Sequence, residues 1–431
     1  MKKLKDSGVE WIGQIPEDWE IVRIKQLFAE VDERCTKGNE YTLLSVSEYY
    51  GVSPKKDHLN EDDMLTHAET LDGYKICRKN DIVMNIMLAW KRALGVSEYV
   101  GIISPAYCVY RARQEVCAKY FHYLFRTDIY AELFKQNSTG IIDSRLRLYP
   151  DKFLALKCQV PPLEQQEKIV SYLDRKCAEI DAIIAKQQQI IEKLKEYKLS
   201  VITEAVTKGL DPNVPMKDSG IDFIGSIPET WRICRLRNIG TLQNGISKGG
   251  EFFGHGFPFV SYGDVYRNFS LPVQVAGLID SSDEERRNYS VESGDIFFTR
   301  TSETIEEVGF SSVCEETIPD ATFAGFLIRV RPFTDDLVPK FAKYYFRSNH
   351  HRYYLVKQMN LVTRASLGQD LLKSMPVLVP PKDEQISIAA YLDKKCGAIE
   401  SSIEYKQRVI ERLIAYKKSL IYEVVTGKKE V

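Results

Sequence analysis

KDSGVEWIGQIPEDWEIVRI, residues 5–24, and KDSGIDFIGSIPETWRICRL, residues 217–236, are two copies of one segment, identical at 12 of 20 positions. A second repeated segment begins VPPLEQQEKIVSYLDRKC at residue 160 and VPPKDEQISIAAYLDKKC at residue 379. The blocks between the repeated segments barely resemble each other. A duplicated frame around two different inserts predicts a protein that performs one task on two different objects.

The second repeated segment has the pattern of a long helix. Its apolar residues recur at alternating spacings of four and three, and each has a counterpart 219 residues later. A sustained period of 3.5 residues is typical of a coiled-coil seam. The predicted seam contains Leu173, Ile180, Ile184, Ile191 and Leu194 in the first copy, and Leu392, Ile399, Ile403, Ile410 and Leu413 in the second. The simplest arrangement is an antiparallel pair with pseudo-twofold symmetry; separate packing of each helix against partner subunits is the alternative.

Both seams are interrupted by polar residues at the same two places. Gln187 matches Lys406, and Lys198 matches Lys417. Polar seam residues reduce stability but can fix the register and the partner of a coiled coil. Alternatively, these long side chains reach out of the seam toward water.

Proline pairs mark where these two helices begin. Pro161-Pro162 and Pro380-Pro381 stand just before the helical pattern, and proline is tolerated only in the first turn of a helix. We therefore expect Gln165 and Gln385 to lie at matching positions in the first turns.

The repeat is close to circular. A Gly- and Pro-containing linker, VTKGLDPNVPMKDSG (206–220), joins the first helix to the second copy of the frame. The last residues, VVTGKKEV, joined to the first residues, MKKLKDSG, would imitate that linker. The two ends of the chain are therefore predicted to lie near each other.

The two inserts combine strand and helix patterns. Strands are expected at 75–86, 102–111, 295–300 and 326–331, and helices at 118–136 and 339–358. The expected domains are 1–160 (first globular domain), 161–208 (central helix), 209–228 (linker), 229–379 (second globular domain) and 380–427 (C-terminal helix). The predicted fold class is α/β (α+β), with two globular domains separated by two long helices that form an antiparallel coiled coil.

Composition excludes several classes of protein. The chain has 59 Lys and Arg against 60 Asp and Glu, which argues against a broadly basic, non-specific nucleic-acid binder but allows a local basic face. It lacks an apolar stretch long enough to span a membrane. Its nine cysteines form no CxxC pair, as expected of reduced thiols in a cytoplasmic protein.

Motifs for catalysis are nearly absent. The chain has neither a G-x-x-x-x-G-K-[ST] phosphate loop nor an H-E-x-x-H zinc motif. Residues 252–256, FFGHG, match F-x-G-x-G, a short pattern found in S-adenosylmethionine sites, but no strand–turn–helix pattern surrounds them. We therefore expect no catalytic site, no metal site and no cofactor on this chain.

Basic residues in polar loops are the candidate DNA contacts, because Arg and Lys bind phosphates and read guanine edges. Arg145 and Arg364 occupy aligned places in the loops that close the two inserts, residues 138–151 and 359–370. An ordinary surface loop with a capping arginine is the alternative. The candidates are Lys91, Arg92, Arg145, Arg147, Lys248, Arg300 and Arg364.

The duplicated G-x-I-P-x-x-W segment, the P-P helix starts and the two rods around divergent blocks resemble the specificity (S) subunit of type I restriction-modification systems. The resemblance covers the whole chain and rests on four segments in the right order. It implies two target recognition domains, each reading one half of a bipartite, asymmetric sequence in double-stranded DNA. It also implies that the rods are a spacer and platform for two methyltransferase (M) subunits, which restriction/translocase (R) subunits join.

The resemblance further implies a cytoplasmic, non-catalytic subunit, whose partners would bind S-adenosylmethionine, ATP and magnesium. It fixes frame positions such as Trp19 and Trp231 but no base-contacting residue. Two other classes stay open: a self-contained S-adenosylmethionine-dependent DNA methyltransferase, and a coiled-coil scaffold without a role on DNA.

Overall fold

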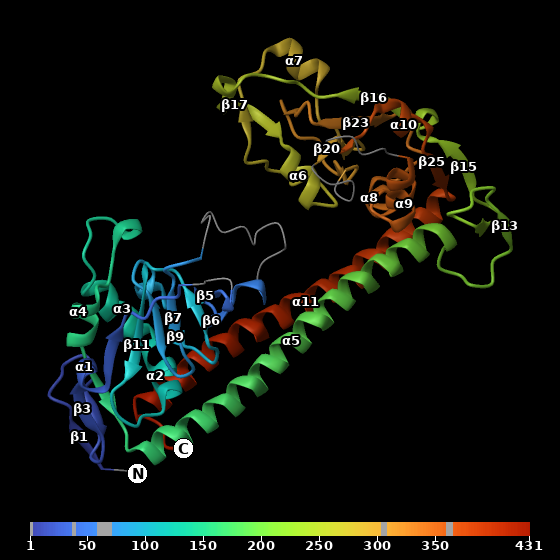
Figure 1. The fold of residues 1–431 in the computed structure, drawn as a ribbon. Helices are drawn as coiled ribbons and strands as arrows, with labels where there is room; N and C mark the ends of the chain where they lie inside the picture. Colours follow the sequence, from blue (N-terminus) through green and yellow to red (C-terminus); the bar gives the residue numbers. More distant parts are fainter. Residues whose placement is uncertain (1–2, 37–39, 58–70, 303–307, 359–364) are drawn as a thin grey trace. The chain divides into compact units, whose positions relative to one another are not determined.

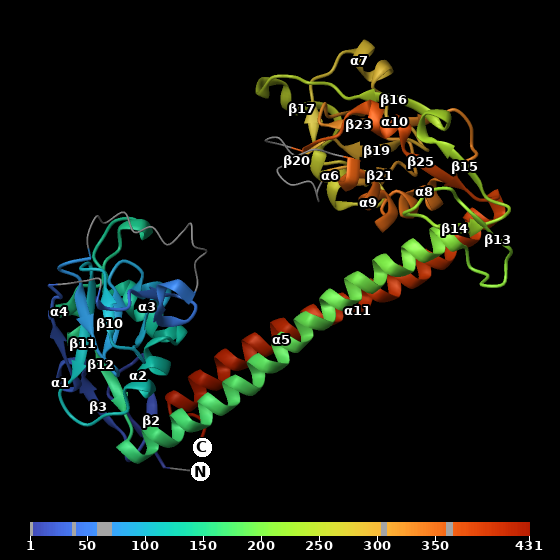
Figure 2. The ribbon, with the colours of Figure 1, turned by 45° about the vertical axis from the view of Figure 1, so that its right-hand side comes forward.

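The computed structural model describes residues 3–36, 40–57, 71–302, 308–358 and 365–431 (Figures 1 and 2). The chain forms two compact units: residues 1–187 with 408–431, and residues 188–407. Two long helices, α5 (Leu163–Lys208) and α11 (Lys382–Val425), contribute to both units. None of the helices in the described ranges is long and apolar enough to cross a membrane.

The first unit is built around a four-stranded antiparallel sheet in the order β4-β11-β8-β9. Frame strands β3 and β12 pair antiparallel, so the insert leaves and rejoins the frame at one place. The strands are β1 (Leu4–Asp6), β2 (Gln14–Pro16), β3 (Glu20–Arg23), β4 (Phe28–Val31), β5 (Leu44–Ser47), β6 (Gly51–Pro54), β7 (Lys75–Cys77), β8 (Ile82–Asn85), β9 (Leu94–Val96), β10 (Gly101–Ile103), β11 (Tyr107–Ala112) and β12 (Lys157–Val160). The shorter helices are α1 (Ile24–Leu27), α2 (Ala118–Phe125), α3 (Asp128–Gln136) and α4 (Pro150–Ala155), with 3₁₀ turns η2 (Lys55–Asp57), η4 (Ala89–Lys91) and η5 (Asp143–Arg145).

The second unit repeats this plan with a sheet in the order β16-β23-β19-β21 and a frame pair β15-β25. Its strands are β13 (Met216–Asp218), β14 (Ser226–Pro228), β15 (Arg232–Arg235), β16 (Gly240–Asn244), β17 (Phe253–Val260), β18 (Leu278–Ile279), β19 (Ile296–Thr299), β20 (Thr301–Ser302), β21 (Ser311–Val313), β22 (Thr322–Phe323), β23 (Leu327–Pro332), β24 (Ala365–Ser366) and β25 (Pro376–Val379). Its helices are α6 (Tyr262–Arg267), α7 (Asp283–Asn288), α8 (Pro339–Tyr345), α9 (Asn349–Gln358) and α10 (Gln369–Ser374), with 3₁₀ turns η6 (Leu236–Asn238) and η7 (Gly250–Phe252).

The two inserts therefore share the strand order of their four-stranded sheet, although their sequences barely resemble each other. Their smaller sheets differ: the first insert has the pairs β5-β6 and β7-β10, and the second has the three-stranded sheet β18-β17-β22 and the pair β20-β24. The central strands β8 (IVMN) and β19 (IFFT) are buried along their whole length, as expected of β-branched and apolar runs inside a sheet. Each follows a tight turn: Asn80 and Gly294 take left-handed backbone conformations, with φ of 70° and 94°. The similarity of these sheets is not visible when the two insert sequences are compared directly with each other.

Several predicted elements divide in two. The stretch 75–86 forms β7 and β8 with a turn between them, and 102–111 forms most of β10 and β11. The helix predicted at 118–136 is interrupted after Phe125, because Thr127 Oγ1 donates to the carbonyl of Leu124 at 2.8 Å and ends α2 there. The pattern at 339–358 likewise forms α8 and α9.

Within each unit the two long helices run antiparallel. In the first unit, Leu173 of α5 and Val424 of α11 belong to one apolar core. In the second, Val201 of α5 shares a core with Leu392 of α11. The ten predicted seam residues are all buried or half-buried, whereas most neighbouring helix positions are exposed.

Both long helices end at a glycine beside a tryptophan. Gly209 after α5 has φ +77°, and a Cβ there would lie 3.6 Å from Trp231. Gly427 after α11 has φ +73°, and a Cβ there would lie 3.2 Å from Trp19. A left-handed glycine is a common C-terminal cap, so the frame closes in the same way twice.

The two ends of the chain lie close together, as the circular repeat predicted (Figure 1). In the first unit, Leu4 and Val431 line one cavity of about 240 Å³. The segment predicted as a linker, 209–228, contains the hairpin of β13 and β14, which matches the hairpin of β1 and β2.

Candidate nucleic-acid interface

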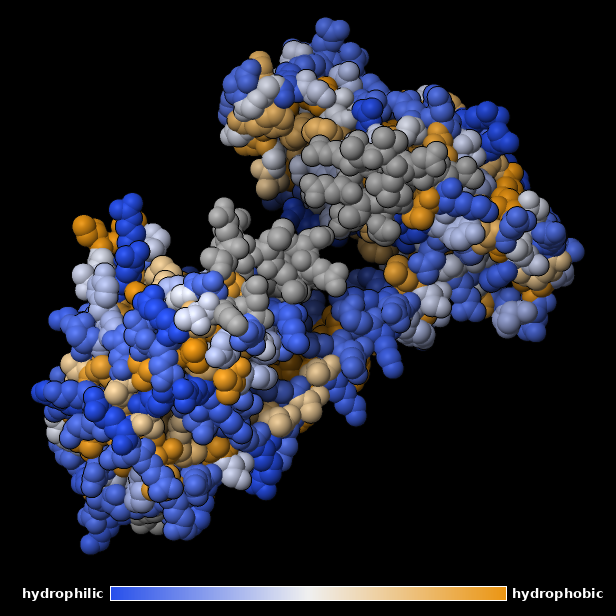
Figure 3. Space-filling model, viewed as in Figure 1, coloured by the Kyte–Doolittle hydropathy of each residue, from blue (hydrophilic) through white to orange (hydrophobic). Residues whose placement is uncertain are grey.

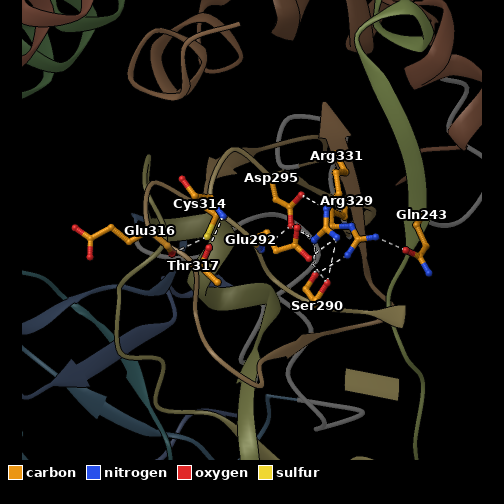
Figure 4. Close-up of polar contacts among 10 residues, drawn as sticks. Gln243, Ser290, Glu292, Asp295, Cys314, Glu316, Thr317, Arg329 and Arg331 are labelled. Carbon is orange, nitrogen blue, oxygen red and sulfur yellow. Dashed lines mark hydrogen bonds and ion pairs between the residues drawn. The ribbon is translucent and has the colours of Figure 1, made fainter. Parts of the chain in front are cut away.

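An aspartate and an arginine brace the central strands in both units. Asp295, at the start of β19, accepts a hydrogen bond from the backbone N–H of Glu292 at 2.8 Å, which closes the turn. Nε and Nη2 of Arg331 donate to the two carboxylate oxygens of Asp295 at 2.7 and 2.6 Å (Figure 4). These hydrogen bonds raise the pKa of the Arg331 guanidinium and fix β19 against β23.

The first unit repeats the brace with Asp81 and Arg111. Asp81 accepts from the backbone N–H of Arg78 at 2.8 Å, and Arg111 donates to both of its oxygens at 3.0 and 2.9 Å. The bidentate bond to Asp81 raises the pKa of Arg111. Because Asp81 matches Asp295, and Arg111 matches Arg331, positions in the two sheets can be equated.

At the far end of β8, two loops of the first unit meet. The carbonyl of Ile86 accepts from the N–H of Leu148 at 2.9 Å, which ties the loop that closes the insert to the sheet. The Trp90 ring lies 5.2 Å from the Lys91 ammonium and 5.0 Å from that of Lys135. The structure therefore brings η4 and the closing loop to one edge.

Three predicted contact residues at this edge are exposed: Lys91, Arg145 and Arg147. Within the described part of the chain, their side-chain charges have no ion-pair partner. Arg92 differs, because its guanidinium pairs with Asp128 at the start of α3. Of the four candidates in the first unit, three are therefore available for a ligand.

The equivalent edge of the second unit carries Arg300. Its backbone N–H donates to the carbonyl of Phe326 at 2.8 Å, and its carbonyl accepts from Leu367 at 2.7 Å, as Ile86 does from Leu148. Among the described residues, the Arg300 guanidinium has no hydrogen-bond or ion-pair partner. The turn before Phe326 contacts the loop at residues 246–248, because the N–H of Gly325 donates to the carbonyl of Ile246 at 2.7 Å.

The other two candidates of the second unit, Lys248 and Arg364, cannot be counted as available cations. The Lys248 ammonium donates to the carbonyl of Asp280 and to Glu285, both at 2.7 Å, and only 17% of its side chain is exposed. The hydrogen bond from Lys248 lowers the pKa of Glu285. Arg364 lies outside the described residues.

Two arginines missed by sequence reasoning, the half-buried Arg126 and the buried Arg347, support the two edges. The Arg126 guanidinium, at the end of α2, donates to five backbone carbonyls: Ser47, Glu48, Tyr49, Arg92 and Leu94. Two of those carbonyls, those of Arg92 and Leu94, follow the η4 turn, so Arg126 fixes the backbone next to Lys91. Burial lowers the pKa of Arg126 to about 10, which leaves it charged at neutral pH.

Arg347 does the same in the second unit, where it donates to the carbonyls of Ser311, Val265, Tyr266 and Asn268. Burial lowers its pKa to about 10 as well. The signal that could have found both is the shared pattern Tyr-x-Phe-Arg, in YLFRTD (123–128) and YYFRSN (344–349).

Matching tyrosines bind each insert to a long helix. Tyr123 donates to Asp174 of α5 at 2.6 Å, and Tyr344 donates to Asp393 of α11 at 2.7 Å. The carboxylates are 219 residues apart, like the seam residues. The inserts are thus connected to the long helices in the same manner twice.

The first turns of the long helices correct one sequence alignment. The side-chain amide of Gln166 donates to the Pro161 carbonyl at 2.8 Å, and that of Gln385 donates to Pro380 at 2.9 Å. Gln385 therefore matches Gln166, and the predicted pairing with Gln165 was wrong by one residue.

Gln165 has a different role, because it accepts a hydrogen bond from Trp19 Nε1 at 3.0 Å. In the second unit, Trp231 Nε1 donates to Glu384 at 2.9 Å, so Glu384 is the equivalent of Gln165.

The described residues offer no arrangement for metal chemistry: within them, no group of three or more His, Cys, Asp or Glu side chains could hold a metal ion. The F-x-G-x-G match falls on η7 and the exposed start of β17, which is a ribbon strand and not a strand–turn–helix unit. His351 is buried against the ring of Tyr345.

Comparison with curated proteins finds relatives that cover most of the chain. The chain is 24% identical over 307 residues to the type I restriction enzyme EcoKI specificity subunit of Escherichia coli (strain K12). That alignment covers 67% of this chain and 61% of the relative. The chain is 23% identical over 433 residues to the type I restriction enzyme MjaVIII specificity subunit of Methanocaldococcus jannaschii, over 97% and 94% of the two chains.

Two solved structures share the fold. One, from work on complex assembly and conformational transition of the type I R-M system, contains a chain that aligns with a TM-score of 0.73 at 17% identity, over 96% of this chain and 99% of that one. The HsdS subunit from Thermoanaerobacter tengcongensis aligns with a TM-score of 0.54 at 17% identity, over 96% and 98%.

The family assignment rests on the sequence itself. The type I restriction modification DNA specificity domain matches the chain twice, over residues 16–196 and 228–410, so that each match takes in one insert and part of the long helix after it. Together the matches cover well over half of the chain, which therefore belongs to the type I restriction-modification specificity-subunit family.

Proposed function

We propose that the two units each read one half of a bipartite DNA sequence. The observation that carries this proposal is the repeated edge: equivalent sheet ends, each held by an arginine that binds several backbone carbonyls, present cations without an ion-pair partner among the described residues. Lys91, Arg145 and Arg147 stand at the first edge, and Arg300 stands at the second. Cations at loop ends bind phosphates and base edges, and their rigid sheet support favours sequence readout over non-specific contact.

The two halves of the target should differ in sequence. Ile86 and Ala106 in the first unit occupy the positions of Arg300 and Phe326 in the second, as counted from the Asp–Arg braces. Different side chains at equivalent places favour different bases, so the target is asymmetric.

The frame would act as the platform for the other subunits. On the face drawn in Figure 3, hydrophilic residues dominate and apolar residues form separate groups. The long helices nonetheless expose large apolar side chains, and Tyr197 of α5 and Tyr416 of α11 are a pair 219 residues apart. Repeated exposed tyrosines suit two copies of one partner, since tyrosine is enriched at protein interfaces.

These partners are two methyltransferase subunits, joined by restriction/translocase subunits, in the cytoplasm. S-adenosylmethionine, ATP and magnesium chemistry belongs to them, and this chain contributes recognition without a catalytic centre of its own. A groove of about 1240 Å³ in the first unit, lined by α2, α5 and α11, offers further surface for a partner.

Methylome sequencing with and without the gene tests the proposal. The expected result is a split, asymmetric methylated motif that disappears with the gene. A methylome that is unchanged by deletion would contradict the role in recognition, and DNA methylation by the purified chain alone would contradict the non-catalytic assignment.

A further inference from the structure

Phe326 is an apolar side chain that is exposed to solvent on a backbone fixed by hydrogen bonds. It is 64% exposed and directly precedes β23. Its carbonyl accepts the Arg300 N–H at 2.8 Å, and the following Leu327 N–H donates to Ala324 at 2.9 Å, which closes the turn. The backbone is thus fixed on both sides, while the ring has no core to pack into.

Phe326 and Arg300 are neighbours across two strands. Thr299 of β19 lies opposite Leu327 of β23, so Arg300 and Phe326 form the next antiparallel pair. Side chains that lie directly opposite point to the same face, with Cβ atoms roughly 5 Å apart. An exposed ring and a guanidinium without a partner among the described residues therefore project together from the reading edge.

The first unit has no such pair at the same place. Ala106 stands five residues before Arg111, as Phe326 stands five residues before Arg331, and Ile86 follows β8 as Arg300 follows β19. The ring and the guanidinium are therefore not needed by the shared fold. A feature that the fold does not need, at the edge proposed to read DNA, points to recognition.

We propose that Arg300 and Phe326 are the specificity-determining pair of the second recognition domain. Arg300 donates to the acceptor edge of a guanine, and Phe326 packs on the 5-methyl group of an adjacent thymine. This inference rests on the proposed function.

The chemistry of the major groove fits both side chains. Guanine presents the acceptors O6 and N7, which match the donor fork of arginine, and thymine presents its methyl group to apolar side chains. A side-chain separation of roughly 5 Å is close to the 3.4 Å rise between base pairs, so both can reach neighbouring bases.

Thymine-to-uracil substitution isolates the methyl contact. The full-length chain, in complex with its methyltransferase subunits, would be titrated with duplexes of the motif found by methylome sequencing, each with one thymine of the second half-site replaced by uracil. At one position the substitution should weaken binding by about fourfold, as expected from losing the burial of one methyl group. The Phe326→Ala variant should bind the thymine and uracil duplexes equally.

The same strand offers a matched control. Phe333, at the other end of β23, is 61% exposed, and a six-residue strand separates it from Phe326 by roughly 20 Å. Phe333→Ala should leave the uracil effect intact. Arg300→Ala should weaken binding about tenfold and abolish discrimination at one guanine, without effect on the first half-site.

The outcomes separate this inference from the proposed function. If the wild-type complex reads a split motif but Phe326→Ala keeps the full uracil effect, the thymine contact is refuted while DNA reading stands. If Phe326→Ala weakens binding to the thymine and uracil duplexes by the same factor, the ring contributes to binding without contacting the methyl group, and the inference is overturned. A wild-type complex without sequence preference refutes the proposed function itself.

Discussion

The ammonium of Lys198 in α5 is bound to the carboxylate of Glu400 in α11. The same pair recurs in the first unit, where Lys417 of α11 donates to both oxygens of Asp181 of α5 at 2.7 and 2.6 Å. Each residue lies 219 positions from its counterpart. The two seam lysines therefore bind the opposite helix, which favours a role in register over simple exposure to water.

Reversing the charge of Lys198 should destabilise the second unit. Lys198→Glu places like charges together and should lower the free energy of unfolding by about 1 kcal/mol, because partly exposed pairs contribute at most that much. The double variant Lys198→Glu with Glu400→Lys should recover most of the loss in urea unfolding. Lys195→Glu, which disrupts a pair with Glu192 inside α5, is the matched control. Additive effects of the two substitutions would show that the pair carries no coupling.

Removal of Arg126 should affect one half-site only. Arg126→Ala leaves five carbonyls without their donor, which should cost about 3 kcal/mol of stability and weaken binding to the first half-site. Arg126→Lys keeps the charge but not the donor fork, so it should rescue little. Binding would be measured on duplexes in which one half-site at a time is altered.

Arg347→Ala should give the mirror result, a loss at the second half-site alone. If either variant, still folded by circular dichroism, weakened both half-sites equally, the two arginines would be general stabilisers and not supports of separate reading edges.

Lengthening both long helices should lengthen the gap between the half-sites. Seven residues inserted after Gln189 and after Arg408, two equivalent positions, preserve the heptad pattern and add about 10.5 Å to each helix. The methylated motif should keep both halves and gain a gap of about three base pairs. Insertion into one helix alone is the control, and should abolish methylation by breaking the pairing. A longer protein with an unchanged gap would refute the spacer role.

The first unit should lose stability in mild acid through His122. Its side chain is half-buried, and Nδ1 of its imidazole accepts a hydrogen bond from the N–H of Val96 at 3.3 Å. Burial, together with the charges of Arg126 and Lys119 and against the opposing charge of Asp174, lowers the pKa of His122 to about 3. The folded state therefore stabilises the neutral form of the His122 imidazole.

Because the folded pKa lies below the unfolded value of about 6.5, this contribution is complete above that pH and is lost as pH falls toward 3. At pH 5 the loss should be about 2 kcal/mol relative to pH 7. His122→Gln should flatten that slope in urea unfolding followed by tryptophan fluorescence, which reports mainly the first unit because it holds three of the four tryptophans. An unchanged slope would show that His122 does not titrate on unfolding.

Features that depend on local sequence were predictable. The proline-marked helix starts, the seam and the closeness of the chain ends follow from repeat and period, and the structure has them. The seam lysines could not be assigned a role, since that depends on which carboxylate of the other helix stands opposite.

Features that depend on tertiary neighbours were not predictable. The common topology of the inserts rests on a few matching residues, such as the Asp81–Arg111 and Asp295–Arg331 braces, scattered through unlike sequence. Among the candidate contacts, charge alone did not distinguish Arg300, which has no ion-pair partner in the described part of the chain, from Lys248, which is paired with Glu285.

Exchange of one insert tests the central claim most directly. Residues 24–158 would be replaced by the corresponding block of another family member, and the methylome of cells carrying the hybrid would be sequenced. We predict a motif in which one half-site changes while the other half-site and the gap stay as they were. A motif in which both half-sites change, or neither does, would contradict the account of two independent readers on one frame.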